Sequence, residues 1–201
     1  IEKAFKIINK WWTIPEVNII GQFYSRPEFI ASIINRSKEF NLKDYDHVMF
    51  SYHGIPERHV DKVYLDGKPC ADHSCESEIN DENANCYKAT CYATTRLLAK
   101  SLNIKDDFYS TCFQSRLGRD PWLMPYTDHT IERLAKEGKK KVLVFSPAFV
   151  SDCLETTIEI GEEYDELFKE HGGEKLQLVP SLNDYDDWAE NLTKIIKDYT
   201  K

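Results

Sequence analysis

The feature that most constrains the fold is an alternation, along the whole chain, of short apolar runs with longer segments of helical periodicity. Strand-like apolar runs are expected at residues 17–24, 45–52, 107–114, 141–145 and 176–179. Helices are expected at residues 1–12, 27–40, 86–102, 127–138, 152–171 and 184–199. Strands that alternate with helices of this length form parallel βαβ units. The sequence therefore predicts an α/β fold, a doubly wound parallel sheet flanked by helices.

Ligands of such sheets bind at the carboxyl ends of the strands. Three expected strands end near His53, Gln114 and Ser146, so we expect the functional residues there. The chain of 201 residues is long enough for one sizeable domain. No signal peptide or membrane-spanning apolar run is evident. Because the first residue is Ile1 and not Met, we expect a piece of a longer protein.

The net charge of −8 argues against a nucleic-acid partner, because no basic face is available for phosphates. An acidic chain suits a protein that handles cations. Glu155, Glu159 and Glu163 stand four residues apart in the expected helix at 152–171. Like charges at this spacing weaken a helix slightly, and the row slants around an α-helix unless a π-type turn aligns it. The row is either a solvated acidic face or a functional one.

A histidine follows the expected strand at 45–52, immediately before a Gly-Ile-Pro turn. His53 at this place can ligate a metal or accept protons near neutral pH. The alternative is a histidine that only hydrogen-bonds its own turn.

Four cysteines, Cys70, Cys75, Cys86 and Cys91, lie within one polar segment that runs into a helix start. Thiolates in this pattern bind zinc or an iron–sulfur cluster, and two disulfides are the alternative. Structural zinc sites usually contain a pair of cysteines two residues apart, whereas both pairs here are separated by four residues. Cys112 is expected in the core.

Four motifs, in order along the chain, resemble those of the ferrochelatase family. They are Phe50-Ser51-x-His53-x-x-Pro56, Gln114-Ser-x-x-Gly118, Pro121-Trp122-Leu-x-Pro125-x-Thr-Asp128 and Ser151-Asp152-x-x-Glu155-Thr-x-x-Glu159. The resemblance runs from about residue 17 to residue 182 and covers only the C-terminal half of a family member. It implies a chelatase-like, flavodoxin-like half in which residues 1–201 form the C-terminal chelatase domain. Residues 66–91 would form a cysteine-rich metal-binding insertion within it.

The resemblance implies an enzyme that inserts ferrous iron into protoporphyrin IX to form haem. It assigns His53 as base and metal ligand, Glu155 as the second iron ligand, and Glu159 and Glu163 as a line of acids for metal or protons. It implies porphyrin contacts for Tyr52, Gln114 and Trp122. Because some bacterial members hold a [2Fe–2S] cluster in an internal cysteine segment, it favours this cofactor over zinc at Cys70, Cys75, Cys86 and Cys91.

The expected partners are the porphyrin, ferrous iron and the remaining N-terminal domain of the same protein, in the cytoplasm. Peripheral membrane contact and a homodimer stay open. Many family members have a histidine where this chain has Cys153, for which we expect a small buried hydrophobe. The competing functions are insertion of cobalt into another tetrapyrrole and a non-catalytic iron–sulfur or zinc-binding domain. The isolated chain is expected to be inactive, because half of the porphyrin cleft would be missing.

Overall fold

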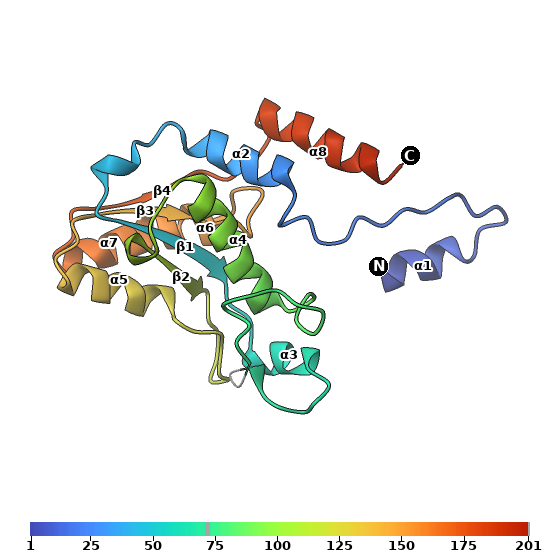
Figure 1. Ribbon diagram of the computed structural model, residues 1–201, viewed down its shortest axis with the longest axis horizontal. Helices are drawn as coiled ribbons and strands as arrows, with labels where there is room; N and C mark the ends of the chain where they lie inside the picture. Colours follow the sequence, from blue (N-terminus) through green and yellow to red (C-terminus); the bar gives the residue numbers. More distant parts are fainter. Residues whose placement is uncertain (71–72, 201) are drawn as a thin grey trace.

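The computed structural model of the protein describes residues 1–70 and 73–200 (Figure 1). Its sheet consists of four parallel strands, β1 (His47–His53), β2 (Tyr109–Gln114), β3 (Lys141–Phe145) and β4 (Lys175–Leu178), in the order β2-β1-β3-β4. After β1 the chain forms β2 on one side of β1 and then β3 on its other side. This arrangement confirms the predicted α/β fold and places a topological switch point between β1 and β3.

Helices cover both faces of the sheet, because the side chains of each strand alternate between two apolar layers. Val48 and Phe50 belong to the layer that packs beneath α2 (Pro27–Ser37), α4 (Tyr87–Ser101) and α8 (Asp186–Asp198). Met49 belongs to the opposite layer, beneath α5 (Thr127–Lys136) and α7 (Tyr164–Glu170). Figure 1 shows α2 and α8 side by side on one side of the sheet and α5 and α7 on the other. Even-numbered residues of β1 therefore point to one face of the sheet and odd-numbered residues to the other.

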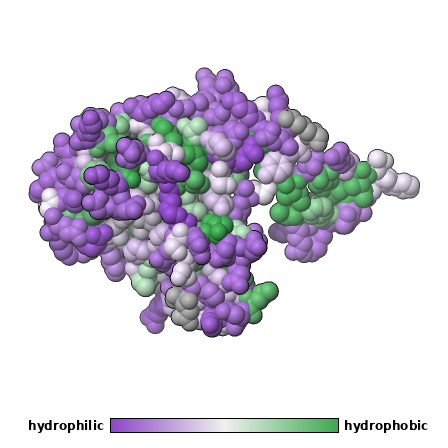
Figure 2. Space-filling view, in the orientation of Figure 1, coloured by the Kyte–Doolittle hydropathy of each residue, from purple (hydrophilic) through white to green (hydrophobic). Residues whose placement is uncertain are grey.

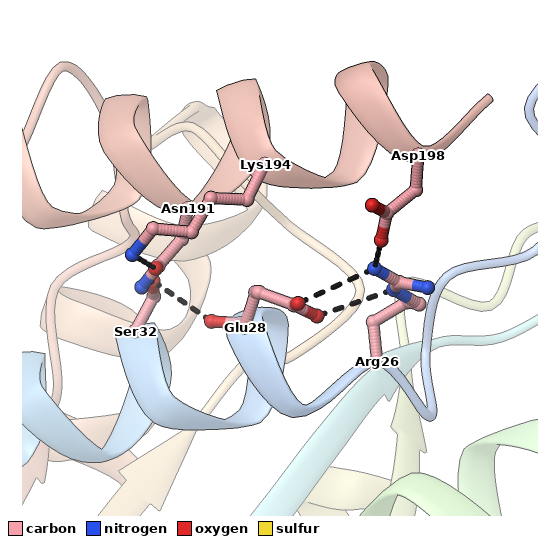
Figure 3. Close-up of polar contacts among 6 residues, drawn as sticks. All are labelled: Arg26, Glu28, Ser32, Asn191, Lys194 and Asp198. Carbon is pink, nitrogen blue, oxygen red and sulfur yellow. Dashed lines mark hydrogen bonds and ion pairs between the residues drawn. The ribbon is translucent and has the colours of Figure 1, made fainter. Parts of the chain in front are cut away.

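Polar contacts attach the last helix to α2 (Figure 3). The guanidinium of Arg26, at the start of α2, donates to the carboxylates of both Glu28 and Asp198. In the buried part of the same contact, the Asn191 amide donates to the Ser32 hydroxyl at 2.8 Å. Exposed ion pairs contribute at most about 1 kcal/mol, so the apolar layer beneath α8 holds the helix in place.

The prediction of a strand at residues 17–24 is wrong. Within the described residues this stretch pairs with no strand, and it continues from α1 (Glu2–Ile8) as an extended arm. Only its end reaches the core: Ile20 and Phe23 pack against the apolar layer beneath α2 and α8, whereas Val17 and Ile19 are 39% and 45% exposed. Figure 2 shows apolar side chains, beside hydrophilic ones, on the lobe that contains α1 and stands away from the rest of the molecule.

The described part of the polar segment after β1 includes the short helices α3 (Glu57–Val60) and η2 (Asp61–Val63). Part of the expected cysteine-rich insertion at 66–91 lies outside the described residues, at positions 71 and 72. The acidic helix expected at 152–171 is divided into three parts. They are α6 (Leu154–Thr157), a π-helix labelled η5 (Glu159–Glu163), and α7. Within the described residues, no helix has both the length and the apolar character needed to cross a membrane.

Candidate functional site

His53 is the last residue of β1, and its own backbone turn fixes the orientation of its imidazole. Nδ1 lies 2.6 Å from the carbonyl oxygen of Gly54. A carbonyl only accepts, so Nδ1 carries the proton and Nε2 keeps the lone pair. The imidazole therefore has a nitrogen that is free to take up a proton or to bind a metal ion.

The backbone comes unusually close to a neighbouring strand next to His53. A Cβ at Gly54 would lie 2.8 Å from the Gln114 carbonyl oxygen and 3.3 Å from the Trp122 ring. Only glycine fits this position without displacing one of them. The Gly-Ile-Pro turn thus brings β1, β2 and the Trp122 loop together behind the imidazole.

Two aromatic rings flank the imidazole of His53. The ring centroid of Trp122 lies 6.5 Å from that of His53, and the ring centroid of Phe149 lies 6.2 Å from it. The Trp122 ring is fixed because its Nε1 donates to the Leu117 carbonyl at 2.9 Å. Both aromatic residues are half-buried, which leaves part of each ring open to a ligand.

Glu155 lies in α6, within electrostatic range of His53. A hydrogen bond from the Cys153 thiol, followed by its own backbone N–H and by a positive charge on His53, lowers the pKa of the Glu155 carboxyl. The carboxylate is therefore ionised near neutral pH and attracts the positive charge that the imidazole carries whenever it is protonated. The expectation that Cys153 is a small buried hydrophobe is wrong: its side chain is half-buried and caps the start of α6.

The row of glutamates passes through the π-helix. The backbone N–H groups of Glu162 and Glu163 both donate to the Ile158 carbonyl, at 3.0 and 2.9 Å. This wider turn takes more residues per rotation than an α-helix, so side chains four residues apart drift less around the axis. The π-type turn considered from the sequence is confirmed at Glu159–Glu163. Glu163 is exposed, whereas Glu159 is half-buried.

The carboxylate of Glu159 accepts four hydrogen bonds. Its donors are the Ser115 backbone N–H at 2.9 Å, the Ser115 hydroxyl at 2.5 Å, the Tyr164 hydroxyl at 2.8 Å and the Gln114 amide at 3.2 Å. Ser115 adopts a φ of +64°, which non-glycine residues rarely adopt. This conformation turns its N–H toward the carboxylate, and such strain is typical of functional sites. Glu159 is thus a fixed anion that joins the end of β2 to the π-helix.

Gln114 lies inside the protein and not on the cleft surface. It is 2% exposed, accepts a hydrogen bond from Ser51 at 2.8 Å and donates to the Glu155 carbonyl at 2.7 Å. The amide therefore holds the first turn of α6, and with it the Glu155 side chain, against β1 and β2. The expectation that Gln114 contacts the porphyrin is replaced by this positioning role.

Tyr52 lies on the opposite face of β1 from His53. Its side chain is 2% exposed, and its hydroxyl hydrogen-bonds to that of Thr95 in α4 at 2.9 Å. The expected contact between Tyr52 and a porphyrin does not fit this burial, because successive strand residues point to opposite faces.

Three of the four predicted metal-binding cysteines gather at one point. The sulfur atoms of Cys70, Cys75 and Cys86 all lie within 4.8 Å of one another, and Cys70 and Cys75 are 3.6 Å apart. All three residues are at most 3% exposed. Hydrogen bonds from the Cys70 and Cys75 thiols lower the pKa of Cys86, so this sulfur is the first to ionise. Buried sulfur atoms at these distances suit a thiophilic metal centre.

Cys91 is buried but stands outside this group. It follows Cys86 by five residues on α4, which corresponds to about 7.5 Å along a helix axis and roughly 140° around it. Four ligands of a binuclear cluster are shared between two iron atoms, so they need not all reach one point. Cys112 is 0% exposed, which confirms its expected place in the core.

Several residues of these sites carried little signal in the sequence. Ser115 directly follows Gln114, so the Gln-Ser motif could have indicated it, but its left-handed backbone could not be foreseen. Tyr164 reaches Glu159 only because of the π-helix. Phe149 lies in the turn after β3, close to Ser146, and could have been predicted because ligands bind at the carboxyl ends of parallel strands. Lys88 pairs with Glu76 at 2.6 Å near the cysteines, and its sequence context is that of an ordinary surface lysine.

The protein belongs to the class of α/β proteins that bind a ligand at the carboxyl ends of parallel strands. An imidazole, a row of carboxylates and aromatic rings surround the switch point of its sheet. The chain belongs to the ferrochelatase family, whose model, described as Ferrochelatase, matches residues 1–200. A protein of Pseudomonas fluorescens (strain Pf0-1) named Ferrochelatase is 40% identical over 197 residues, which are 97% of this chain and 58% of that protein. A Ferrochelatase of Legionella pneumophila (strain Lens) is 42% identical over 198 residues, which are 98% of this chain and 59% of that protein. The chain therefore spans somewhat more than half the length of these curated relatives.

Proposed function

We propose that this chain supplies one side of a site that inserts ferrous iron into protoporphyrin IX to form haem. The observation that carries the proposal is the arrangement at His53. The Nδ1 of the imidazole faces the Gly54 carbonyl, which leaves Nε2 available, the ionised carboxylate of Glu155 lies within electrostatic range, and the ring centroids of Trp122 and Phe149 lie 6.5 and 6.2 Å away. Family membership supports the same reaction.

Iron insertion requires that the two pyrrole N–H groups of the porphyrin lose their protons. Nε2 of His53 accepts the two pyrrole protons one after the other and passes each to the acidic row, and the Glu155 carboxylate stabilises the imidazolium that forms each time. Glu155 is an oxygen donor for the incoming Fe²⁺, and the imidazole is a nitrogen donor only while its Nε2 is unprotonated. Trp122 and Phe149 offer flat apolar surfaces that hold the macrocycle while its nitrogen atoms turn toward the metal.

Glu159 and Glu163 continue the acidic row away from His53 along the π-helix. Glu163 is exposed and attracts hydrated cations to this edge, and Glu159 adds a fixed negative charge between it and Glu155. The row thus forms a negative path for ferrous iron inward or for protons outward. Gln114 acts as a positioning residue, because it holds the backbone of Glu155.

The proposal is tested in the full-length protein with His53→Ala and, as a matched control, His129→Ala at an exposed histidine of α5. Haem formation from protoporphyrin and Fe²⁺ under anaerobic conditions is the measurement. His53→Ala should reduce kcat at least about 100-fold, the usual contribution of a general base. A His53→Ala protein that forms haem at the wild-type rate would overturn the proposal. If cobalt is inserted in preference to iron, the alternative chelatase is favoured.

We propose further that Cys70, Cys75, Cys86 and Cys91 hold a [2Fe–2S] cluster. The support is the donor set: three buried sulfur atoms within 4.8 Å, and a fourth thiol on the helix that Cys86 begins. A cluster bound there would cross-link the loop after β1 to α4 and add a redox-active centre. Structural zinc is the alternative for the same thiols.

Cys75→Ser in the full-length protein tests the cluster. Anaerobically purified wild-type protein should contain about two iron atoms per chain and absorb visible light. The variant should lose the absorbance and melt at a lower temperature, whereas Cys112→Ser at a buried core cysteine should keep the absorbance. An unchanged spectrum and melting temperature in Cys75→Ser would contradict the proposal, and zinc in place of iron would favour the alternative.

The apolar α1 and its arm are proposed to pack against the part of the protein that this chain does not span, since its relatives are longer. That part, expected to be the N-terminal domain, would supply the second wall of the porphyrin cleft. The free thiols of Cys70, Cys75 and Cys86 favour a reducing compartment, which supports the proposed cytoplasmic location.

A further inference from the structure

Tyr87 lies between the clustered cysteines Cys70, Cys75 and Cys86, called the thiol group below, and the end of β1 that carries His53. Tyr87 follows Cys86 directly and is the first residue of α4. Its hydroxyl donates to the carbonyl oxygen of His53 at 2.8 Å. A sulfur atom of the thiol group and the side chain that holds the backbone of the proposed base therefore belong to consecutive residues.

The thiol group fixes the start of α4. Cys86 is the N-cap residue of the helix; its N–H donates to the Asn83 carbonyl at 2.8 Å, and its own carbonyl accepts from Thr90 at 3.0 Å. The Cys86 sulfur lies within 4.8 Å of those of Cys70 and Cys75. A metal bound to Cys86 consequently sets the position of the first turn of α4, which carries Tyr87.

Tyr87 also lies next to the remaining cysteine. Tyr87 and Cys91 line one cavity with Tyr52 and the turn after β3. The phenol thus lies between a cysteine and the His53 backbone.

Helix α4 holds the end of β1 at two successive residues. Thr95 hydrogen-bonds to Tyr52 at 2.9 Å, and Tyr87 hydrogen-bonds to His53 at 2.8 Å. The Thr95 contact lies in the interior of the helix, whereas the Tyr87 contact depends on its first turn. Helix ends open more readily than helix interiors, so the His53 attachment is the one that responds to the thiol group.

We propose that Tyr87 is a positioning residue that couples metal occupancy of the thiol site to the orientation of His53. The inference rests on the proposed function of both sites. With metal bound, the start of α4 is fixed and Tyr87 holds the His53 carbonyl, so the imidazole keeps its orientation toward the cleft. Without metal, the first turn of α4 loses its anchor and the orientation of His53 is no longer held. The coupling passes through directly connected groups: one peptide bond joins Cys86 to Tyr87, and one hydrogen bond joins the Tyr87 hydroxyl to the His53 carbonyl.

The test uses the full-length metal-loaded protein and Tyr87→Phe, which removes only the hydroxyl. Tyr92→Phe is the matched control, because Tyr92 lies on the same helix and packs against Phe113, with ring centroids 6.3 Å apart. Metal content and visible absorbance should be those of the wild type in both variants. Tyr87→Phe should lower kcat for iron insertion about fivefold, the effect of one lost neutral hydrogen bond, with little change in the porphyrin KM.

The second measurement does not depend on activity. In protein labelled at histidine, the imidazole NMR signal of His53 is assigned with His53→Ala and compared before and after the metal is stripped. Stripping should move this signal in the wild type and in Tyr92→Phe and leave it in place in Tyr87→Phe. A signal that moves equally in Tyr87→Phe, or a kcat equal to that of Tyr92→Phe, overturns the coupling while the metal site stands. A wild-type protein that carries neither iron nor zinc overturns the metal site and the coupling together.

Discussion

Gly54 is where the smallest change should have a large effect on the site. Its N–H donates to the Gln114 carbonyl oxygen at 2.8 Å, and a Cβ at the same residue would meet that oxygen at 2.8 Å as well. The oxygen belongs to the last residue of β2, which pairs in register with His53, so it cannot turn aside as a flexible side chain would. Gly54→Ala must therefore push β1 and β2 apart at their carboxyl ends, or push Trp122 outward.

The cost follows from two opposing contributions. Forcing an extra carbon atom into a packed position costs roughly 1 to 3 kcal/mol. Replacing glycine by alanine also restricts the unfolded chain, which returns about 0.4 to 1 kcal/mol. We expect Gly54→Ala to lower the free energy of unfolding by about 1 to 2 kcal/mol. Because the displaced groups surround His53, kcat for iron insertion should fall as well.

Urea denaturation followed by circular dichroism measures the stability, and steady-state haem formation measures the activity. Gly21→Ala is the matched control, because no atom lies within 4 Å of a Cβ at that position. The control should be neutral or slightly stabilising. An unfolding free energy of Gly54→Ala equal to that of Gly21→Ala, within about 0.5 kcal/mol, would refute the close approach of the strands.

Two further predictions concern the body of the fold. Burial, helped by Lys139 and Arg133, lowers the pKa of His47 to about 4, below its usual value of about 6.5. The unfolded chain then binds the proton first, so stability should fall as the pH drops from about 6.5 to about 4, by at most about 1.4 kcal/mol per pH unit. His47→Gln should flatten this slope in urea titrations at a series of pH values, and an unaltered slope would contradict the assignment. Phe168 is 0% exposed beneath the sheet, so Phe168→Ala should cost about 3 to 5 kcal/mol in thermal or urea unfolding. A loss below about 1 kcal/mol would show that α7 does not pack as described.

The α/β fold could be predicted from the sequence because its strands are buried on both faces. Val142 to Val144 and Val48 to Phe50 are apolar at consecutive positions, as parallel strands covered by helices require. The strand expected at 17–24 does not form, although its apolar residues satisfy the same pattern. Within the described chain these residues pair with neither edge strand, β2 or β4, so an apolar pattern alone does not decide whether a segment joins the sheet.

The candidate site was predictable where its residues stand at strand ends and unpredictable where backbone geometry decides. His53 is the last residue of β1, and the rule for parallel sheets indicates it without further information. The burial of Gln114 could not be read from its motif, because an amide at a strand end looks the same whether it contacts a ligand or holds α6. The grouping of Cys70, Cys75 and Cys86 without Cys91 depends on where α4 begins, and helix boundaries are the least certain part of a sequence-based prediction.

The three sets of functional residues are attached to the same two strand ends. His53 ends β1, Gln114 ends β2 and holds Glu155, and α4 joins the thiol group to β1 through Tyr87. Gln114 is buried and Tyr87 is half-buried, and a buried donor or acceptor that loses its partner costs about 1 to 3 kcal/mol. A displacement at one attachment is therefore resisted by the other two, so the imidazole and the carboxylate keep their geometry on an edge that is open on one side. Such rigidity suits the proposed role of this edge as one side of a porphyrin site. A flexible edge would adapt to the flat porphyrin, and the pyrrole nitrogen atoms would then stay in the plane of the ring.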